Sequence, residues 1–449
     1  MDETTSDAAV RNWLEHHIGP VRSFERQPRW RPAWFADVQR DGAVLPLYVR
    51  ADREGLEFSL STHREADILE ALENHGIPVP HIYGRIETPQ AIVMDRLPGT
   101  NDLSNALTSV ERNSVLDEYM DILTRVHRLD PSEFVEKGLR IPPDPEHHAL
   151  SSFEQAVSRY RATKQRPEPF LEFGIGWVRR NVPTHRFDPR LVLGDPGQFM
   201  FADGRITGLL DVELAYLGDI AHDLAALRLR NISEPFGDLQ RAFRRYEEVA
   251  GVELDLPVVE FHTAQFSLTT PLSLVMILHN TFPMSELIQY AEWFQQCSLN
   301  AVEAMAAVAG VALDDYRLPH VADVRHGDLA DALAPIIEQL PADTDVDRFR
   351  RHQTAQTARY IADLCRYGSA IEAENIDDIE ALLDSRCIDW RSGDAALEEF
   401  VLTAPASMDA ELIRLFHRRI MRQMRLLEPV LNRGGGVQPL TPLTVLLDR

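Results

Sequence analysis

Acidic residues stand at turns and strand ends in the middle of the chain, between residues 191 and 227. Asp195 opens the turn Asp-Pro-Gly after the apolar run Leu-Val-Leu, and Asp211 follows Gly-Leu-Leu at the end of another apolar run. Carboxylates held at such places can accept the proton of a reacting hydroxyl or bind a hard cation such as Mg²⁺. Asp-Pro-Gly is also an ordinary turn. An acidic residue that ends a buried-looking strand is unusual, and we therefore interpret Asp211 as functional.

Short strands, set within a mainly helical part of the chain, must position these carboxylates. The stretches 191–193, 198–201 and 206–211 are typical of strands, and Asp203-Gly204 predicts the turn between the last two. They interrupt a chain that reads as helical from about residue 103 onward. This order differs from the regular strand–helix alternation of a parallel sheet.

The N-terminal part of the chain has a more mixed pattern. A strand is predicted over Ala43–Arg50 and a helix over residues 62–75. Glu65 lies three residues after Thr62, which is the spacing of a capping box at the start of that helix. A second short strand is predicted at residues 91–94.

The segment 191–227 resembles the catalytic segment of aminoglycoside phosphotransferases and their relatives. The family pattern is HGD with Asn five residues after the Asp, a hairpin that ends in a D-W-E-like triplet, and then GD and DLA. The matching residues here are Gly194-Asp195, Asp211-Val212-Glu213, Gly218-Asp219 and Asp223-Leu224-Ala225. Within the family, the run PGQFMFADGRITGLLDVELAYLGD is most similar to the phosphotransferase domains associated with acyl-CoA dehydrogenases.

This resemblance implies ATP and Mg²⁺ as cofactors and gives the carboxylates separate roles. Asp195 would orient or deprotonate the acceptor hydroxyl, as phosphoryl transfer requires. Asp211 would be the main Mg²⁺ ligand, because this cation prefers carboxylate oxygen. Gln198 would supply an amide oxygen to the same metal. Glu213 would contact the residues that bind the metal, and not the metal itself.

Upstream residues match the nucleotide-binding parts of the same family. Arg50 stands where the family usually has a phosphate-contacting Lys, and Glu65 matches the helix residue that pairs with that cation. The run IVMDRLPG resembles the hinge, so that Met94 would line the nucleotide site and the backbone around Asp95 and Leu97 would bind adenine. The alternatives are a surface position for Arg50 and a purely capping role for Glu65.

The sequence departs from the family pattern at three places. Leu193 replaces the His of HGD, and the catalytic loop is about two residues short, so Gln198 would take the place of the Asn. The stretch Phe24–Phe35 contains no Gly, although its residues Arg26, Arg29 and Arg31 could contact phosphates. These departures are the reason for an alternative hypothesis, a catalytically inactive pseudokinase that binds a nucleotide or a protein partner.

The fold class predicted is α+β, a two-lobed protein-kinase-like fold with an additional C-terminal all-helical region. Residues 1–98 would form the N-terminal lobe and residues 99–309 the helical lobe with the catalytic hairpin. Residues 310–449 would form a separate helical region, through which a homodimer could assemble. In this region His326-Gly327-Asp328 spells HGD, but a helical pattern follows it, and we interpret Asp328 as a helix cap.

Charge narrows the classes of partner. The net charge is −24, from 70 acidic and 46 basic residues, which argues against nucleic acid and against an anionic membrane surface. The chain has only 3 cysteines and no long apolar run, so we expect a cytoplasmic protein. The expected partner is a small molecule with a hydroxyl group, and a hydroxylated acyl or alcohol metabolite is favoured over an aminoglycoside, which the acidic surface would also suit.

Overall fold

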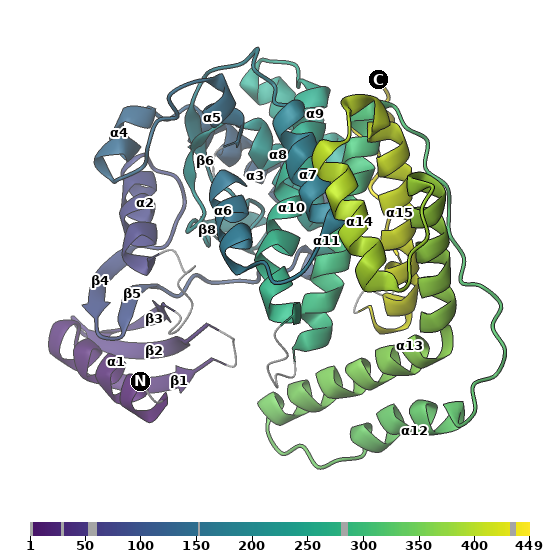
Figure 1. The fold of residues 1–449 in the computed structure, drawn as a ribbon. Coiled ribbons are helices and arrows are strands. Elements are labelled where there is room, and N and C mark those ends of the chain that lie inside the picture. The colour runs from purple at the N-terminus through teal and green to yellow at the C-terminus, as the bar shows by residue number, and fades with distance from the viewer. Residues whose placement is uncertain (1–2, 28–30, 53–60, 151–152, 280–285, 432–436) are drawn as a thin grey trace. The chain divides into compact units, whose positions relative to one another are not determined.

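A computed structural model describes the chain except for residues 1–2, 28–30, 53–60, 151–152, 280–285 and 432–436 (Figure 1). The chain divides into two units. Unit 1 contains residues 1–148 and 186–254, and unit 2 contains residues 149–185 and 255–449. None of the helices in the described ranges has the length and apolar character needed to cross a bilayer.

A five-stranded antiparallel sheet forms the N-terminal part of unit 1 (Figure 1). Its spatial order is β1 (Val21–Arg26), β2 (Ala33–Arg40), β3 (Ala43–Ala51), β5 (Gln90–Asp95) and β4 (Ile82–Glu87). Two helices accompany the sheet, α1 (Glu3–His17) and α2 (Thr62–Asn74). The strands and the helix predicted before residue 98 are therefore present.

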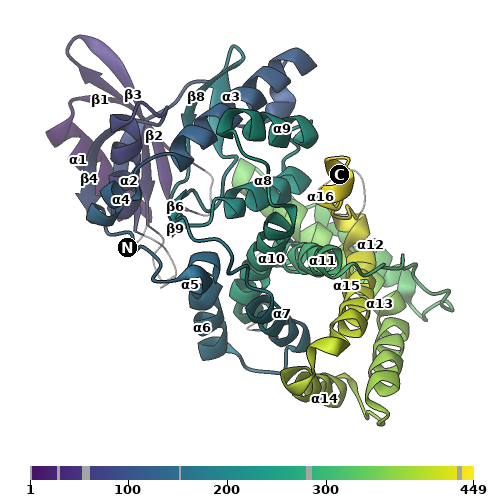
Figure 2. The ribbon, with the colours of Figure 1, turned by 90° about the horizontal axis from the view of Figure 1, so that it is seen from above.

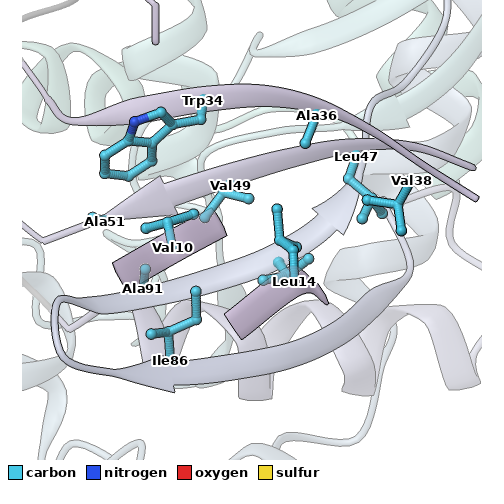
Figure 3. Close-up of a cluster of buried hydrophobic side chains, with 11 residues drawn as sticks. Val10, Leu14, Trp34, Ala36, Val38, Leu47, Val49, Ala51, Ile86 and Ala91 are labelled. Carbon is cyan, nitrogen blue, oxygen red and sulfur yellow. The ribbon is translucent and has the colours of Figure 1, made fainter. Parts of the chain in front are cut away.

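Apolar residues of α1 and of the strands form one core (Figure 3). Val10 and Leu14 of α1 are fully buried with Trp34 and Val49 of the sheet. Trp34 also donates a hydrogen bond from Nε1 to Asp7, at 2.7 Å, so its polar atom is satisfied inside this core. The packing fixes strands β2 and β3, and β3 carries Arg50.

The rest of unit 1 is helical and contains four short strands. The strands are β6 (Arg190–Val192), β7 (Phe199–Ala202), β8 (Arg205–Leu209) and β9 (Tyr216–Gly218). β7 and β8 form the predicted hairpin, whereas β6 pairs with β9, which the sequence did not predict. The α-helices are α3 (Ser109–His127), α4 (Pro131–Glu136), α5 (Pro145–Leu150, which ends in unit 2), α8 (Ala221–Ser233) and α9 (Leu239–Ala250), and η1 (Leu103–Asn105) is a 3₁₀ turn.

Unit 2 contains helices and no strands among its described residues. Its α-helices are α6 (Phe153–Thr163), α7 (Pro169–Arg180), α10 (Leu256–His279), α11 (Leu287–Ala309), α12 (Gly327–Glu338), α13 (Asp345–Leu383), α14 (Trp390–Thr403), α15 (Asp409–Leu427) and α16 (Leu443–Leu446), and η2 (Ala406–Met408) and η3 (Glu428–Val430) are 3₁₀ turns. α10 lies along α11 (Figure 2), and α15 packs against both α11 and α13. The α+β fold with a large C-terminal helical region is confirmed.

The two units divide the chain differently from the predicted boundaries at residues 98 and 309. Phe416 of α15 stacks on Phe173 of α7, with ring centroids 5.2 Å apart, so residues after 310 share a core with residues before it. The basic residues of α15 are also paired: Arg422 contacts Asp378 of α13 at 2.7 Å. Helical periodicity in a sequence indicates an apolar stripe on a helix such as α15, but it does not show which helices cover that stripe.

One capping prediction in unit 2 is wrong. The HGD-like triplet begins α12, where His326 occupies the N-cap position and Asp328 lies inside the first turn. The N-cap side chain of α12 makes no capping hydrogen bond. An acidic residue in a first turn still interacts favourably with the helix dipole, which explains its presence there.

Candidate active site

The catalytic loop of unit 1 joins β6 to β7 and contains Asp195. Gly194 has φ of 83°, and a Cβ at this position would lie 2.5 Å from the carbonyl oxygen of Leu214. A side chain there would therefore strain the backbone and collide with it. The requirement for Gly immediately before Asp195 has a local steric cause.

The carboxylate of Asp223, on α8, binds the backbone of this loop. It accepts hydrogen bonds from the backbone N–H groups of Leu193 (2.8 Å) and Gly194 (2.9 Å). The same carboxylate lies 3.1 Å from Nε2 of His127, and all of these groups are buried. The loop thus uses the backbone of Leu193, so the absence of a His side chain at this position leaves the anchor intact.

Asp195 has two donors on one of its carboxylate oxygens. Arg230 of α8 places Nη2 at 2.5 Å from Oδ2, and Gln198 places Nε2 at 3.0 Å from the same atom. Burial raises the pKa of Asp195 above its ordinary value, and the charge of Arg230 acts in the opposite direction. The sequence did not predict Arg230 as part of the site.

Asp211 ends the β7–β8 hairpin in an unusual backbone conformation, with φ of 58°. Its carboxylate Oδ1 lies 2.5 Å from Nη2 of Arg50. Burial acts to raise the pKa of Asp211, but Arg50, Arg31 and Arg230 together act in the opposite direction, and the pKa is lowered. Asp211 is therefore held as a carboxylate, which is the form that a metal ion binds.

Arg50 connects the sheet to the carboxylates. Its Nη1 lies 2.9 Å from Glu65 of α2, and its Nη2 lies 3.4 Å from Glu213. Both members of the Arg50–Glu65 pair are buried, and burial raises the pKa of Glu65 to about 8. The surface alternative for Arg50 is thereby excluded.

The predicted capping box between Thr62 and Glu65 is wrong. Ser61 is the N-cap of α2 and accepts a hydrogen bond from the N–H of His63, while the N–H of Thr62 donates to Asp52 at 2.9 Å. The Glu65 side chain points to Arg50 instead. A buried cation attracts this carboxylate more strongly than a helix amide does.

Two further arginines enter the site from the segments around it. Arg31, just before β2, is buried and places Nη2 at 2.6 Å from Oε2 of Glu213. Arg64 of α2 donates to the carbonyl oxygens of Glu213 (3.0 Å) and Ala215 (2.6 Å), and burial lowers its pKa. Together they fix the segment after Asp211.

The glycine-free stretch contains two other arginines. Arg26 forms an ion pair with Asp7 at 2.8 Å, and Arg29 lies outside the described residues. The sequence did not predict Arg64 as a site residue. Its position next to Glu65 on the same helix is the one feature that could have indicated it.

The hinge residues are attached to the catalytic hairpin. The Asp95 N–H donates to His81 at 3.0 Å and the Asp95 carboxylate accepts from Tyr83 at 2.9 Å, so this residue is fixed by β4. Thr100 and Phe201 exchange two backbone hydrogen bonds of 3.0 and 2.9 Å. The hinge and β7 therefore form one hydrogen-bonded piece.

Packing strengthens the same connection. Leu97 packs against Gly208 of β8, where a Cβ would lie 2.6 Å from its Cδ1 atom. Met94 of β5 is buried and pairs with Tyr48 of β3. Among the described residues, no hydrogen bond uses the N–H of Leu97, which leaves it available for an adenine ring.

The oxygen donors available fit a magnesium ion that also binds phosphates. Asp211 offers a carboxylate, and Gln198 lies opposite the preceding residue, Leu210, whose N–H donates to the Gln198 carbonyl at 2.9 Å. Within the described ranges no group of three or more His, Cys, Asp or Glu residues could hold a metal. Mg²⁺ needs no such group, because it keeps several waters and takes one or two protein oxygens plus phosphates.

Comparisons with known proteins establish the family and the fold. A family model described as the phosphotransferase enzyme family (APH) matches residues 32–259, which cover every site residue above except Arg31. The chain belongs to this family. No curated protein sequence matches the chain.

Solved structures of phosphotransferases share the fold. A putative aminoglycoside phosphotransferase from Ralstonia eutropha is 19% identical, with a TM-score of 0.51 over 66% of this chain and 97% of that one. A thermostable mutant of the aminoglycoside phosphotransferase APH(4)-Ia, in a ternary complex with AMP-PNP and hygromycin B, is 16% identical, with a TM-score of 0.51 over 66% of this chain and 99% of that one. At these sequence identities, the similarity to the two solved structures is evidence for the fold alone.

Proposed function

We propose that this phosphotransferase is an ATP- and Mg²⁺-dependent kinase that acts on a hydroxyl group of a small molecule. The observation that carries the proposal is the convergence of Arg50, Glu65 and Asp211 from three separate elements. A phosphate-binding cation, the helix carboxylate that orients it and a metal-binding carboxylate are the parts that phosphoryl transfer needs. Asp195 lies on the neighbouring loop and supplies the fourth part.

The reaction proposed is an in-line transfer. The acceptor oxygen forms a bond to the γ-phosphorus, and the bond between that phosphorus and the β,γ-bridging oxygen breaks, so ADP leaves. Asp195 accepts the hydroxyl proton, and its free oxygen for this purpose is Oδ1, because both donors lie on Oδ2. Arg50 neutralises phosphate charge after exchanging Asp211 for the nucleotide.

Asp211 and Gln198 are the residues that would hold the magnesium ion. When bound, this ion neutralises charge on the β- and γ-phosphate oxygens. Met94, Asp95 and Leu97 would contact adenine, the last two through their backbone. The Asp95 carbonyl and the Leu97 N–H are the groups that we assign to the ring.

A hydroxylated acyl or alcohol metabolite is our preferred acceptor, from the resemblance of residues 196–219 to phosphotransferase domains associated with acyl-CoA dehydrogenases. The net charge of −24 also suits a cationic aminoglycoside, so charge alone does not separate the two classes. Screening both classes with the same ATP-consumption assay distinguishes them. The use of ATP also leads us to propose a cytoplasmic location.

The pseudokinase alternative has one structural observation in its favour. Arg50 lies on Asp211 and Arg230 lies on Asp195, so each candidate catalytic carboxylate is already neutralised by an arginine. A protein that never binds MgATP could keep these pairs permanently. A kinase must exchange at least the first pair.

Calorimetry of ATP binding, with and without Mg²⁺, tests the proposal. We expect Mg²⁺-dependent binding to the wild type and clearly weaker binding to Asp211→Ala. Asp188→Ala is the matched control, because Asp188 is an exposed unit 1 carboxylate paired with Arg190 at 3.0 Å. Absence of nucleotide binding by the wild type would reject the kinase, and binding without any phosphoryl transfer would support the pseudokinase.

We also propose a homodimer through helix α12. This helix exposes an apolar stripe in which Leu329 is 71%, Leu333 43% and Ile336 58% exposed. In a symmetric dimer, a second copy of the chain would cover this apolar stripe with its own.

A further inference from the structure

Arg230 connects helix α8 to the candidate catalytic loop. Asp223 in the first turn of α8 binds the amides that precede Asp195, and Arg230 follows Asp223 by seven residues. Seven residues are about two helical turns, so both side chains project from the same face. One helix therefore holds the loop at two points, before Asp195 and at Asp195 itself.

The Arg230 guanidinium contacts three acceptors at once. Nη2 lies 2.5 Å from Oδ2 of Asp195, Nε donates to the carbonyl oxygen of Pro196 at 3.1 Å, and Nη1 lies 3.1 Å from Glu234. The Arg230 side chain is 15% exposed, so these contacts form in a largely dehydrated environment. Two of the three acceptors belong to the catalytic loop.

We infer that Arg230 is a positioning residue for Asp195, and this inference rests on the proposed kinase function. With Gln198, it supplies both donors to Oδ2 and so determines the direction of Oδ1, which must receive the hydroxyl proton. A planar guanidinium suits this task, because it can bind a carboxylate and a carbonyl at a fixed angle. Lys could supply the charge, but it could not reproduce both contacts.

The role follows from what proton transfer requires. A general base must lie within hydrogen-bond reach of the proton, and small errors of orientation lower the rate strongly. Asp223 restrains the backbone before Asp195, but a general base also needs restraint of the direction of its side chain. Arg230 supplies that restraint from a rigid helix.

Arg230→Met and Arg230→Lys test this role, with acceptor-free ATP hydrolysis as the reaction because water can replace the unidentified acceptor. For Arg230→Met we expect kcat to fall by about 10²-fold, within the range for general acid–base groups. We expect the Kd for MgADP, measured by calorimetry, to change less than about twofold, since Arg230 contacts the loop rather than the nucleotide. Arg230→Lys should recover part of the lost kcat.

A double-mutant cycle separates positioning from a structural role. Asp195→Asn should lower kcat strongly by itself, and adding Arg230→Met should lower it little further, because the two residues act as a unit. Arg241→Met is the matched control; Arg241 is a unit 1 arginine that pairs with Asp117 at 2.5 Å, away from the loop. This control should keep wild-type kcat.

The outcomes distinguish this inference from the proposed function. Wild-type kcat in Arg230→Met, or effects of the two substitutions that multiply in full, would overturn the positioning role while the kinase remained. A parallel loss of kcat, MgADP affinity and thermal stability, without recovery by Lys, would also overturn it in favour of a structural role. Wild-type protein that binds no nucleotide or hydrolyses none would overturn both proposals.

Discussion

Replacing Arg50 with Met would remove the cation that three carboxylates share. Its guanidinium lies 2.9 Å from Glu65, 2.5 Å from Asp211 and 3.4 Å from Glu213. Met keeps much of the aliphatic stem, so the main change is the loss of charge. The three acidic side chains would then lack their shared cation in a mostly buried site.

The cost follows from the exposure of each partner. Removing one member of a buried ion pair destabilises a protein by about 3–5 kcal/mol. We take the lower end, about 3 kcal/mol, because Asp211 is 30% exposed and Glu213 keeps Arg31. For a unit of this size, 1 kcal/mol corresponds to about 2–4 °C, so the Tm of unit 1 should fall by roughly 6–12 °C.

The loss should depend on pH with a definite sign. The pKa of Glu65 is about 8 in the folded protein, against ~4.3 in an unfolded chain. Between these values the folded state binds more protons than the unfolded state, so the contribution of Glu65 to stability falls as pH rises. Loss of Arg50 raises this pKa further, and the difference between variant and wild type should therefore be larger near pH 8.5 than near pH 5.5.

Scanning calorimetry at both pH values measures this difference. Arg245→Met is the control, because Arg245 pairs with Asp121 at 2.7 Å on the exposed side of unit 1. A half-exposed pair of this kind contributes about 0–1 kcal/mol. If Arg50→Met melted like this control at the higher pH, or lost more stability at the lower pH, the assignment of Arg50 as the shared cation would be refuted.

Three further predictions concern unit 2. Phe416→Ala should destabilise it by about 3–5 kcal/mol in urea unfolding, because Phe416 is buried on Phe173; an unchanged midpoint would contradict this packing. A chain truncated after residue 310 should aggregate, since α7 and α11 would lose the helices that cover them, and a monodisperse truncated chain in light scattering would show the region to be separable. Leu333→Glu should convert a dimer to a monomer in light scattering, whereas Cys365→Ser, an exposed change on α13, should not.

The parts of the site that local patterns could predict are those with motif spacing. Asp195, Asp211, Arg50 and Glu65 follow recognisable turns, strands or helices, and the structure brings them together. Arg230 carries no motif of its own. Arg230 lies 35 residues after Asp195, on a helix that packs against the loop. The one sequence feature related to its role is its seven-residue spacing from Asp223.

The division into units was less accessible from sequence. Helical periodicity shows that a helix has an apolar face, but it does not name the partner of that face. Residues 149–185 fold with residues 255–449, so the chain leaves unit 1 and returns to it. Boundaries drawn as consecutive segments could not represent that path.

The hydrogen-bonded connection between Thr100 and Phe201 bears on how the protein would distinguish nucleotides that carry different numbers of phosphates. Hydrogen bonds and packing join the hinge at Leu97 to the hairpin that ends at Asp211, so the separation between the proposed adenine and metal positions would be fixed before any nucleotide arrives. A nucleotide with fewer phosphates cannot slide along this piece to reach Asp195 while its base stays on the hinge. Discrimination between ATP and ADP would then depend on whether the terminal phosphate reaches Asp195, and not on the affinity of the site for adenine.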